Sequence, residues 1–241
     1  MFNSLWVSAL KLRFNGNIVY DLDLYNRHGV FNDRFDAGIK LSNACREVFD
    51  HVDYVFAIPM GGVPIGVEIA KALNAEFDLL ICRKLLIPWN REAGFGAVDP
   101  DGNVYVDLEF AMELGLTESD VKSAIKEQLN EIEKRNVRLR GGRPYPNLEG
   151  KSVILVDDGI AAGYTMNSAI KFCRKRGANK IYIAVPTGST RSVKLLSQYV
   201  DLILCLNLRD DIWFAVADAY KFWRDLNEDD VMKILRNLHL H

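Results

Sequence analysis

The 241-residue sequence predicts an α/β fold with a central parallel sheet flanked by helices. From residue 53 onward, short apolar runs of strand length alternate with helical patterns, as in βαβ units. The run Val153–Val156 is continuously apolar, as expected for a central parallel strand that is covered on both faces. Hydrophobic residues make up 49% and charged residues 26% of the chain, which is the balance of a globular protein with a large core.

A β-hairpin and a helix are predicted before this alternation begins. Leu10–Phe14 alternates in polarity, Asn15-Gly16 follows, and Asn17–Tyr20 continues the pattern. Asn-Gly supplies the two positive φ angles of a type I′ turn, so these residues predict a hairpin. Apolar residues then recur at helical spacing over residues 34–50.

The remaining elements follow from periodicity and from the residues that interrupt it. A segment rich in Gly, Asn, Pro and charge predicts a long mobile loop at 88–102, and Thr117 with Asp120 begins a helix in the manner of a capping box. In order, the expected elements are strand 53–58, helix 63–73, strand 77–82, loop 88–102, strand 104–108, helix 117–138, strand 153–156, helix 165–176, strand 181–185, helix 191–198, strand 202–206 and a C-terminal helix within 213–238.

Charge and cysteine usage narrow the class of protein. Thirty Lys and Arg against 32 Asp and Glu give a net charge of −2, which disfavours a nucleic-acid or membrane-surface partner. No apolar run approaches the roughly 20 residues of a membrane span. The four cysteines are far apart and form no C-x-x-C, so neither a zinc site nor a disulfide framework is expected. These features favour a cytoplasmic protein with reduced thiols.

The residues that follow the central strand carry the clearest chemistry, because ligands bind at the carboxyl ends of strands in open parallel sheets. Asp157 and Asp158 end that strand, and the small-residue turn Gly159–Gly163 leads into a helix at Tyr164-Thr165. The turn and helix start offer N–H groups, and with the Thr165 hydroxyl they suit a phosphate dianion. The two carboxylates suit sugar hydroxyls or Mg²⁺. Together they predict a cradle for a ribose 5-phosphate.

Residues 153–165 resemble the phosphoribosyl-pyrophosphate (PRPP) signature of the type I phosphoribosyltransferases, and the span from Phe31 to Leu238 is similar to a little-characterised bacterial and archaeal branch of that family. The resemblance implies that Asp157 and Asp158 are the catalytic acids on the ribose hydroxyls, with Mg²⁺ bound directly or through water or those hydroxyls. It implies a 5′-phosphate site made by Gly159, Ile160, Ala161, Ala162, Gly163, Tyr164 and Thr165. It also implies two parts: an N-terminal extension (residues 1–30) and the phosphoribosyltransferase core (residues 31–241). The extension and the C-terminal segment of the core would together form a small hood.

Two further segments match the family by position. Pro59-Met60-Gly61-Gly62 stands where the family has its pyrophosphate loop, which often contains a cis non-proline peptide, here Pro59–Met60. The usual basic residue of this loop is replaced by Met60. Arg83 and Lys84 follow the next predicted strand and would balance the pyrophosphate, or form a solvated pair of charges.

The predicted 88–102 loop, with Asn90, Arg91 and Glu92, stands where the family has a flexible loop that closes over PRPP and excludes water. Ala161 replaces the Asp that enzymes for 6-oxopurines carry in the signature, which disfavours guanine and hypoxanthine as acceptors. The aromatic residues of the C-terminal part fit either a base-stacking surface or a packed core: Trp213, Phe214, Tyr220, Phe222 and Trp223.

The resemblance therefore implies a Mg²⁺-dependent enzyme that transfers the 5-phosphoribosyl group from PRPP to a nitrogenous base and releases pyrophosphate, as a homodimer or larger homo-oligomer. Two alternatives stay open. A PRPP- or nucleotide-binding regulator with the same fold is favoured by Met60 in the pyrophosphate loop. A scaffold protein with a degenerate site is opposed by the intact Asp157, Asp158 and Thr165.

Overall fold

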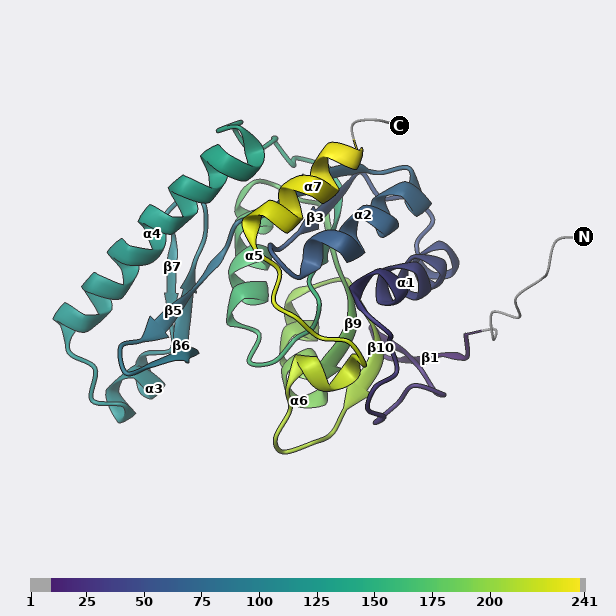
Figure 1. Cartoon of the computed structure of the whole chain (residues 1–241), viewed down its shortest axis with the longest axis horizontal. Coiled ribbons are helices and arrows are strands. Elements are labelled where there is room, and N and C mark those ends of the chain that lie inside the picture. Colours follow the sequence, from purple (N-terminus) through teal and green to yellow (C-terminus); the bar gives the residue numbers. More distant parts are fainter. Residues whose placement is uncertain (1–9, 239–241) are drawn as a thin grey trace, which may run out of the picture.

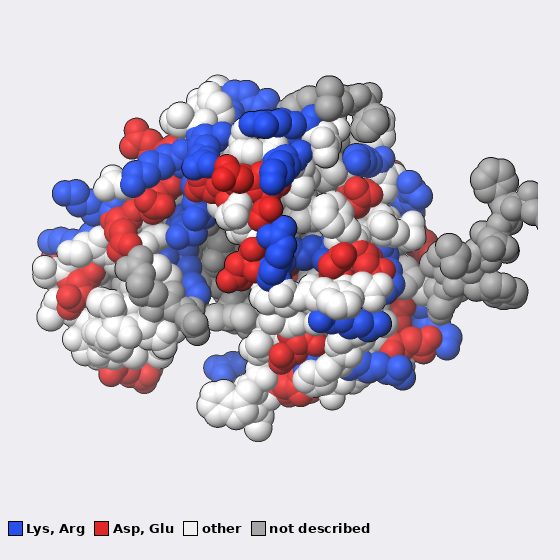
Figure 2. All heavy atoms as spheres, in the orientation of Figure 1, with Lys and Arg blue, Asp and Glu red and all other residues white. Residues whose placement is uncertain are grey.

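The computed structural model describes residues 10–238, so residues 1–9 of the predicted N-terminal extension lie outside the described part. Figure 1 shows a central sheet with helices on both faces and a second, smaller lobe built around α4. Lys and Arg are interspersed with Asp and Glu on the face shown in Figure 2, as the near-zero net charge suggests. None of the described helices is long and apolar enough to cross a membrane.

Seven strands form the main sheet in the order β1-β2-β10-β9-β8-β3-β4, and all neighbours are parallel except β1 and β2. This arrangement confirms the predicted α/β fold. The strands are β1 (Leu12–Asn15), β2 (Ile18–Asp21), β3 (Tyr54–Ala57), β4 (Glu76–Leu79), β8 (Ser152–Val156), β9 (Lys180–Ser189) and β10 (Leu202–Arg209).

Two core layers cover the two faces of this sheet, because successive strand residues point to opposite sides. Val55 and Ile154 pack with α1 (Arg34–Val48) and α2 (Gly62–Leu73). Phe56 and Leu155 pack on the other face with α5 (Tyr164–Lys175) and α6 (Thr190–Leu196), which the short helix η1 (Ser197–Tyr199) follows. A further helix, α7 (Glu228–Leu238), lies against α2 and α4, as Figure 1 shows.

The predicted N-terminal hairpin is present, with Gly16 at φ +62° in its turn. Its strands extend the main sheet, because β2 pairs in parallel with β10 and the Val19 side chain is fully buried in the sheet core. The part of residues 1–30 in a hood stays a prediction. The chain after the hairpin reaches the carboxyl edge, where residues 29–32 run beside residues 218–222. There the Gly29 and Phe31 N–H groups donate to the carbonyls of Asp218 (2.8 Å) and Ala219 (3.0 Å).

The prediction of a long loop at 88–102 is wrong, because most of this segment is a strand. Residues Asn90–Val98 form β6, which pairs antiparallel with β5 (Arg83–Ile87) and β7 (Val104–Val106). Phe95 is fully buried, and a Cβ on Gly96 would lie 2.3 Å from the Tyr105 carbonyl oxygen of the neighbouring strand. The glycines that suggested a loop instead allow close contact between strands. A short helix not predicted from the sequence, α3 (Leu108–Glu113), follows β7.

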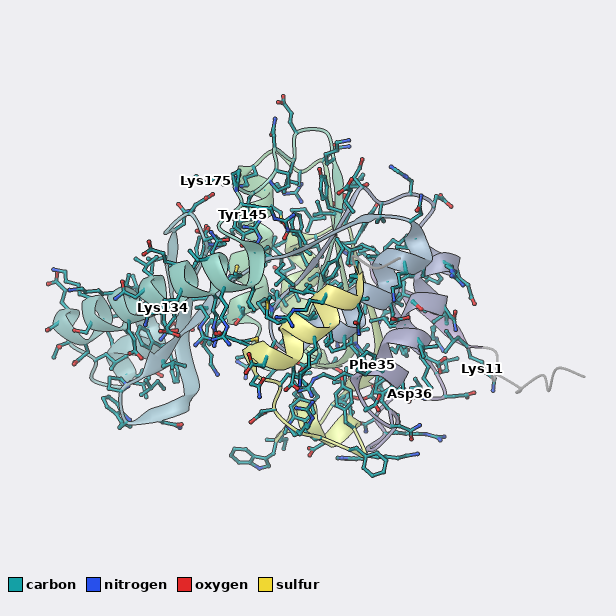
Figure 3. The ribbon with its side chains drawn as sticks, turned by 45° about the horizontal axis from the view of Figure 1, so that its top comes forward. Lys11, Phe35, Asp36, Lys134, Tyr145 and Lys175 are labelled. Atoms are coloured by element: carbon teal, nitrogen blue, oxygen red, sulfur yellow. The ribbon has the colours of Figure 1, made fainter. Side chains whose placement is uncertain are left out.

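Helix α4 (Glu118–Arg140) completes the smaller lobe and anchors it to the main sheet. Its N-terminus has the predicted capping box, in which Thr117 and Asp120 each accept a hydrogen bond from the other's backbone. At its other end, the buried Arg140 guanidinium donates to both Asp78 carboxylate oxygens (2.9 and 2.7 Å). The same guanidinium lies 3.6 Å from the centre of the Tyr145 ring, which Figure 3 labels. This pairing fixes α4 against the edge strand β4.

Candidate functional site

A cavity of about 470 Å³ opens at the carboxyl edge of the main sheet, and its lining brings most of the predicted site residues together. Asp157 contributes from the end of β8, and Lys84 contributes from β5. Ala93 and Gly94 of β6 and Phe110 of α3 close the side toward the smaller lobe. Every residue of the predicted phosphate turn lines the cavity: Gly159, Ile160, Ala161, Ala162, Gly163, Tyr164 and Thr165.

The phosphate turn is held on the sheet by backbone hydrogen bonds. The Ile160 N–H donates to the Thr187 carbonyl (3.0 Å), and the Ser189 N–H donates to the Ile160 carbonyl (2.9 Å). Gly163, at φ +83°, caps α5. The first turn of a helix presents N–H groups that have no acceptor within the helix, and these suit an anion. The backbone at this position is therefore built as a phosphate would require.

Gly159 brings the C-terminal segment close to the turn. A Cβ at this position would lie 2.6 Å from Val216 Cγ1, so only glycine leaves room for the 3₁₀ helix η2 (Val216–Ala219). Val216 itself lines the cavity. The segment that follows β10 thus forms part of the wall of the site.

The two predicted catalytic acids have different surroundings. Asp157 lines the cavity and accepts a hydrogen bond from the Asp158 N–H (2.8 Å). The Asp158 carboxylate instead accepts from Arg34 Nε at 2.8 Å, and the Asp158 carbonyl accepts from the Tyr220 hydroxyl at 2.6 Å.

Burial raises the pKa of both carboxyl groups. The adjacent Asp158 carboxylate raises the pKa of Asp157 further, whereas the Arg34 guanidinium opposes the rise in the pKa of Asp158. Two neighbouring acids thus share one nearby cation. Such a pair is suited to a ligand that brings hydroxyl donors or positive charge.

The predicted pyrophosphate loop packs directly against the acids, and the Pro59–Met60 peptide is cis, as the resemblance implies. A Cβ on Gly61 would lie 1.8 Å from Asp158 Oδ2, and a Cβ on Gly62 would lie 2.6 Å from the Val156 carbonyl oxygen. Both positions therefore need glycine. Gly62 is also the first residue of α2, so a helix N-terminus faces this part of the site.

The structure separates the two predicted cations. Arg83 and Lys84 are the first residues of β5 and do not follow a strand as expected, because β4 ends at Leu79. Since neighbouring strand residues point to opposite sides, only one of them lines the cavity. That residue is Lys84, whereas Arg83 Nε donates to Gln128 Oε1 of α4 (3.1 Å).

The three residues assigned to the flexible loop lie at the start of a strand. Asn90, Arg91 and Glu92 begin β6, directly after the turn at residues 88–89. The Asn90 side chain accepts a hydrogen bond from the Ala93 N–H (3.4 Å). The segment therefore has the backbone of a strand, and its closure over PRPP stays a prediction.

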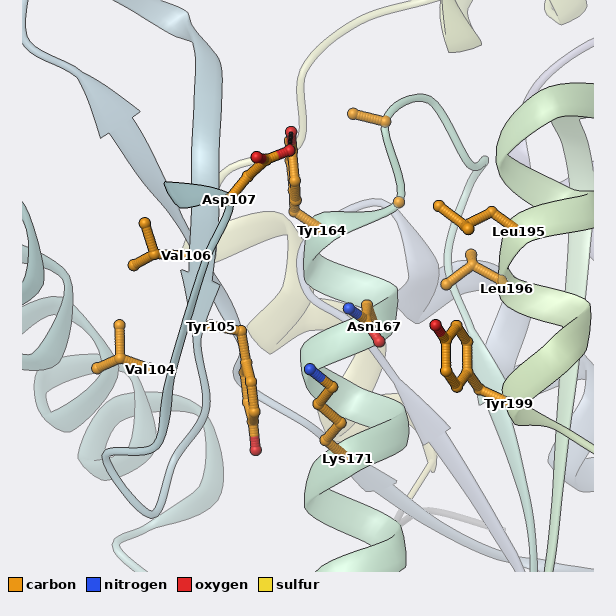
Figure 4. A pocket seen from close by; sticks show the side chains of 12 residues that line it. Val104, Tyr105, Val106, Asp107, Tyr164, Asn167, Lys171, Leu195, Leu196 and Tyr199 are labelled. Atoms are coloured by element: carbon orange, nitrogen blue, oxygen red, sulfur yellow. Dashed lines mark hydrogen bonds between the residues drawn. The ribbon is translucent and has the colours of Figure 1, made fainter. Parts of the chain in front are cut away.

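A second cavity, of about 430 Å³, lies on the other side of the phosphate turn (Figure 4). Ala162, Gly163 and Tyr164 line both cavities. The Tyr164 hydroxyl donates to Asp107 Oδ2 (3.1 Å), and burial together with this carboxylate raises the pKa of Tyr164 to about 12. The neutral Tyr164 side chain therefore links the phosphate turn to the smaller lobe.

Sequence reasoning missed Arg34, which reaches the acids from the start of α1. The guanidinium carbon lies 3.8 Å from the centre of the Trp223 ring and 5.9 Å from that of Tyr220. Of the predicted aromatic residues, Tyr220 is buried in the core, whereas Trp213 is 91% exposed. One feature of the sequence could have indicated Arg34. It directly follows the helix-capping residue Asp33, where the partial positive charge of the helix N-terminus disfavours a cation.

The acidic pair fits a magnesium ion that arrives with a phosphate ligand. In the described part of the chain, no group of three or more His, Cys, Asp or Glu side chains forms a metal cage. Mg²⁺ commonly keeps several waters and binds through one or two carboxylates together with substrate phosphates. Asp157 at the cavity wall provides such a carboxylate.

Comparison with known proteins identifies the family. The sequence pattern of the phosphoribosyl transferase domain matches residues 33–223. Two Mycobacterium tuberculosis proteins, from strains CDC 1551 and H37Rv and named "Putative phosphoribosyl transferase" MT0597 and Rv0571c, are 34% identical over 210 residues. That match covers 87% of this chain and 47% of each relative, so the chain spans about half their length.

Among solved structures, TT1426 from Thermus thermophilus superimposes with a TM-score of 0.70 at 30% identity. The match covers 86% of this chain and 98% of that chain. The two chains therefore share a fold over most of their length. The chain belongs to the phosphoribosyl transferase domain family.

Proposed function

We propose that the chain transfers the 5-phosphoribosyl group of PRPP, with Mg²⁺, to a nitrogenous acceptor and releases pyrophosphate. The observation that carries the proposal is the cavity in which the phosphate turn, Asp157 and Lys84 meet, with the Gly61-Gly62 loop packed on Asp158. In this arrangement the 5′-phosphate lies on residues 159–165, the ribose hydroxyls lie on the acids, and the pyrophosphate lies between the loop and Lys84.

The chemistry that this site offers is positioning and charge stabilisation. A nitrogen of the acceptor forms a bond to ribose C1 while the bond from C1 to the pyrophosphate oxygen breaks, and pyrophosphate leaves with that electron pair. Lys84 and the N-terminus of α2 stabilise the charge that develops on the leaving group. Bound Mg²⁺ would be held by Asp157 and the ligand, and would supply further charge neutralisation.

The acceptor is proposed to be a base other than a 6-oxopurine. Ala161 lines the cavity and has only a methyl group where an acidic side chain would engage a purine ring. Val216 and Phe110 add apolar surface nearby. We also propose that the protein is a homo-oligomer and that it lies in the cytoplasm. The four cysteines, which are all buried and free, are consistent with a cytoplasmic location.

Calorimetric titration of PRPP with and without Mg²⁺ tests the binding site, and pyrophosphate release with a panel of nucleobases tests transfer. We expect Mg²⁺-dependent binding, and at least about tenfold lower turnover for Asp158→Asn, equivalent to about 1.4 kcal/mol. The double variant Asp157→Asn/Asp158→Asn should lose binding. No heat of binding in the wild type would contradict the proposal.

A regulator that binds PRPP or a nucleotide without turnover is the second candidate. Met60 favours it, because the loop lacks the basic side chain that would contact pyrophosphate. The Met60 side chain is packed against the apolar cluster between α2 and the smaller lobe. Binding of PRPP without pyrophosphate release from any acceptor would favour this candidate over the enzyme.

A further inference from the structure

The cavity on the other side of the phosphate turn has no part in the proposed transfer. Its volume of about 430 Å³ lies within the range of roughly 300–1,000 Å³ of small-molecule sites. Helix α5 forms its floor, β7 forms one wall, and α6 with η1 forms the opposite wall (Figure 4). Ala162, Gly163 and Tyr164 line one end, so a ligand here would contact the phosphate turn.

Two side chains on the floor of this cavity can donate hydrogen bonds to a ligand. Asn167 and Lys171 are four residues apart on α5 and therefore lie on one face of that helix. Within the described chain, Lys171 forms no ion pair, and its Nζ lies 4.2 Å from the centre of the Tyr105 ring. The ring face takes up one side of the ammonium and leaves its other N–H groups for an acceptor. The buried Asn167 Oδ1 has no hydrogen-bond partner in the described part of the chain, so no such bond holds the amide through this atom.

The charges in the cavity favour a ligand with one negative group. Asp107 and Lys171 are the only charged residues among the described residues that line it. The Asp107 carboxylate already accepts from the Phe110 N–H (3.0 Å) and from the Tyr164 hydroxyl (3.1 Å). Figure 4 shows Asp107 beside Tyr164, and Lys171 further along α5. The single positive charge of Lys171 is therefore the one that a ligand would match, and Asp107 would repel negative charge near Tyr164.

The wall opposite β7 offers apolar surface. Leu195 is 54% exposed and Tyr199 is 49% exposed, and both line the cavity. Leu196 between them is buried against the phosphate turn, where a Cβ on Gly163 would lie 3.2 Å from its Cδ1. The Tyr199 carbonyl accepts from Arg174 Nη2 (3.4 Å), and this bond ties η1 to α5. A flat apolar group on this wall would cover Leu195 and the Tyr199 ring, and such burial favours binding.

We propose that this cavity binds a small aromatic carboxylate, at a site separate from the one proposed for PRPP. The carboxylate lies between Lys171 and the Asn167 amide, and the ring lies on Leu195 and Tyr199. Charge-assisted hydrogen bonds stabilise the first contact, and burial of apolar surface stabilises the second. The inference does not depend on the use of PRPP, because none of these four side chains lines the other cavity.

The test uses 2-naphthoate, which joins one carboxylate to a flat apolar ring system, and naphthalene-2-carboxamide as its neutral counterpart. NMR titration at neutral pH measures the affinity for each probe, and intermolecular NOEs locate the ring. Lys171→Met and Leu195→Ser each remove one half of the proposed site.

Lys175→Gln is the matched control. Lys175 lies one turn further along α5 and is labelled in Figure 3, and its ammonium donates to Asn103 Oδ1 (2.7 Å), outside the cavity. All three replaced side chains are exposed, so the variants should fold, and thermal unfolding checks this.

We expect 2-naphthoate to bind the wild type with a dissociation constant of about 1 mM or lower. Amide signals of residues 162–164 should shift and saturate, with NOEs from the ring to Leu195 and Tyr199. Lys171→Met should weaken 2-naphthoate binding about five- to tenfold and remove most of the preference over the carboxamide. Leu195→Ser should weaken both probes by a similar factor of about three. Lys175→Gln should match the wild type.

Equal affinity of the wild type for the two probes, or unchanged affinity in Lys171→Met, would overturn the proposal, because the cation would then not recognise the carboxylate. An equal loss in Lys175→Gln would overturn it too, since the effect would then be one of net charge. NOEs to Phe110 or Val216 in place of Leu195 and Tyr199 would place the ring in the other cavity and would also overturn it. Failure of the wild type to bind PRPP would refute the proposed function and leave this inference standing.

Discussion

The contact between the pyrophosphate loop and Asp158 makes Gly61→Ala a sensitive test of the site. The new methyl carbon would lie 1.8 Å from Asp158 Oδ2, whereas ordinary van der Waals contact begins at 3.4 Å. The carboxylate must therefore move by about 1.6 Å, which breaks its 2.8 Å hydrogen bond to Arg34 and displaces it from the proposed ribose position. Hydrogen bonds to a charged group contribute about 1.5–3 kcal/mol each.

Loss of one such bond to the ribose corresponds to about tenfold to 150-fold weaker PRPP binding. Calorimetry with saturating Mg²⁺ measures the change, and unfolding in urea shows whether the variant remains folded. Gly38→Ala is the matched control, because its methyl carbon would meet Ile65 Cα at 3.1 Å and Glu68 at 3.4 Å, away from the acids. PRPP affinity in Gly61→Ala within about twofold of the wild type would refute the placement of Asp158 on the ribose.

Two further predictions concern stability. Phe95→Ala should cost about 3–5 kcal/mol in urea unfolding, because Phe95 is fully buried in the core of the smaller lobe; a value near zero would mean that β6 is not packed there. Asp53 accepts hydrogen bonds from the Ser152 N–H and hydroxyl (both 2.8 Å) and from Lys151 (3.0 Å), and these hold the pKa of Asp53 well below its usual range. This stabilisation is present above the unfolded pKa of about 3.9 and is lost as the pH falls through the lower folded value. Asp53→Asn should therefore lower the free energy of unfolding at pH 7, and should lower it less at pH 3. An equal loss of unfolding free energy at both pH values would contradict this cause.

The phosphate turn was predictable from sequence because its parts are contiguous. The buried strand, the two acids and the small residues lie within 13 consecutive positions, 153–165, and local rules place them at one strand end. The Asn15-Gly16 hairpin and the Thr117 cap were predictable for the same reason. Each depends on backbone geometry over a few residues.

Features that depend on distant partners were not predictable in this way. Glycines such as Gly94 and Gly96 occur both in loops and in strands that lie very close to their neighbours. The local sequence is the same in both cases, and only the position of the partner strand distinguishes them. Arg34 has no motif of its own, because its partners Asp158 and Trp223 lie far away in sequence. The opposite orientations of Arg83 and Lys84 depended on where β5 begins, and strand boundaries are poorly determined by pattern alone.

The pairing of residues 29–32 with residues 218–222 has a consequence for how the protein reaches its active form. Contacts between residues so distant in sequence form slowly. The chain must lose the entropy of closing a long loop before these contacts can stabilise the fold. During synthesis the neighbouring strands β4, β3, β8 and β9 can pair before residues 218–224 have left the ribosome. The acidic pair is then already present, but Arg34 still lacks its partners Trp223 and the Arg224 carbonyl. The nascent chain thus completes the site only after residues 218–224 have emerged, and a chain cut between β10 and η2 would lack the Trp223 ring and the Arg224 carbonyl that contact Arg34.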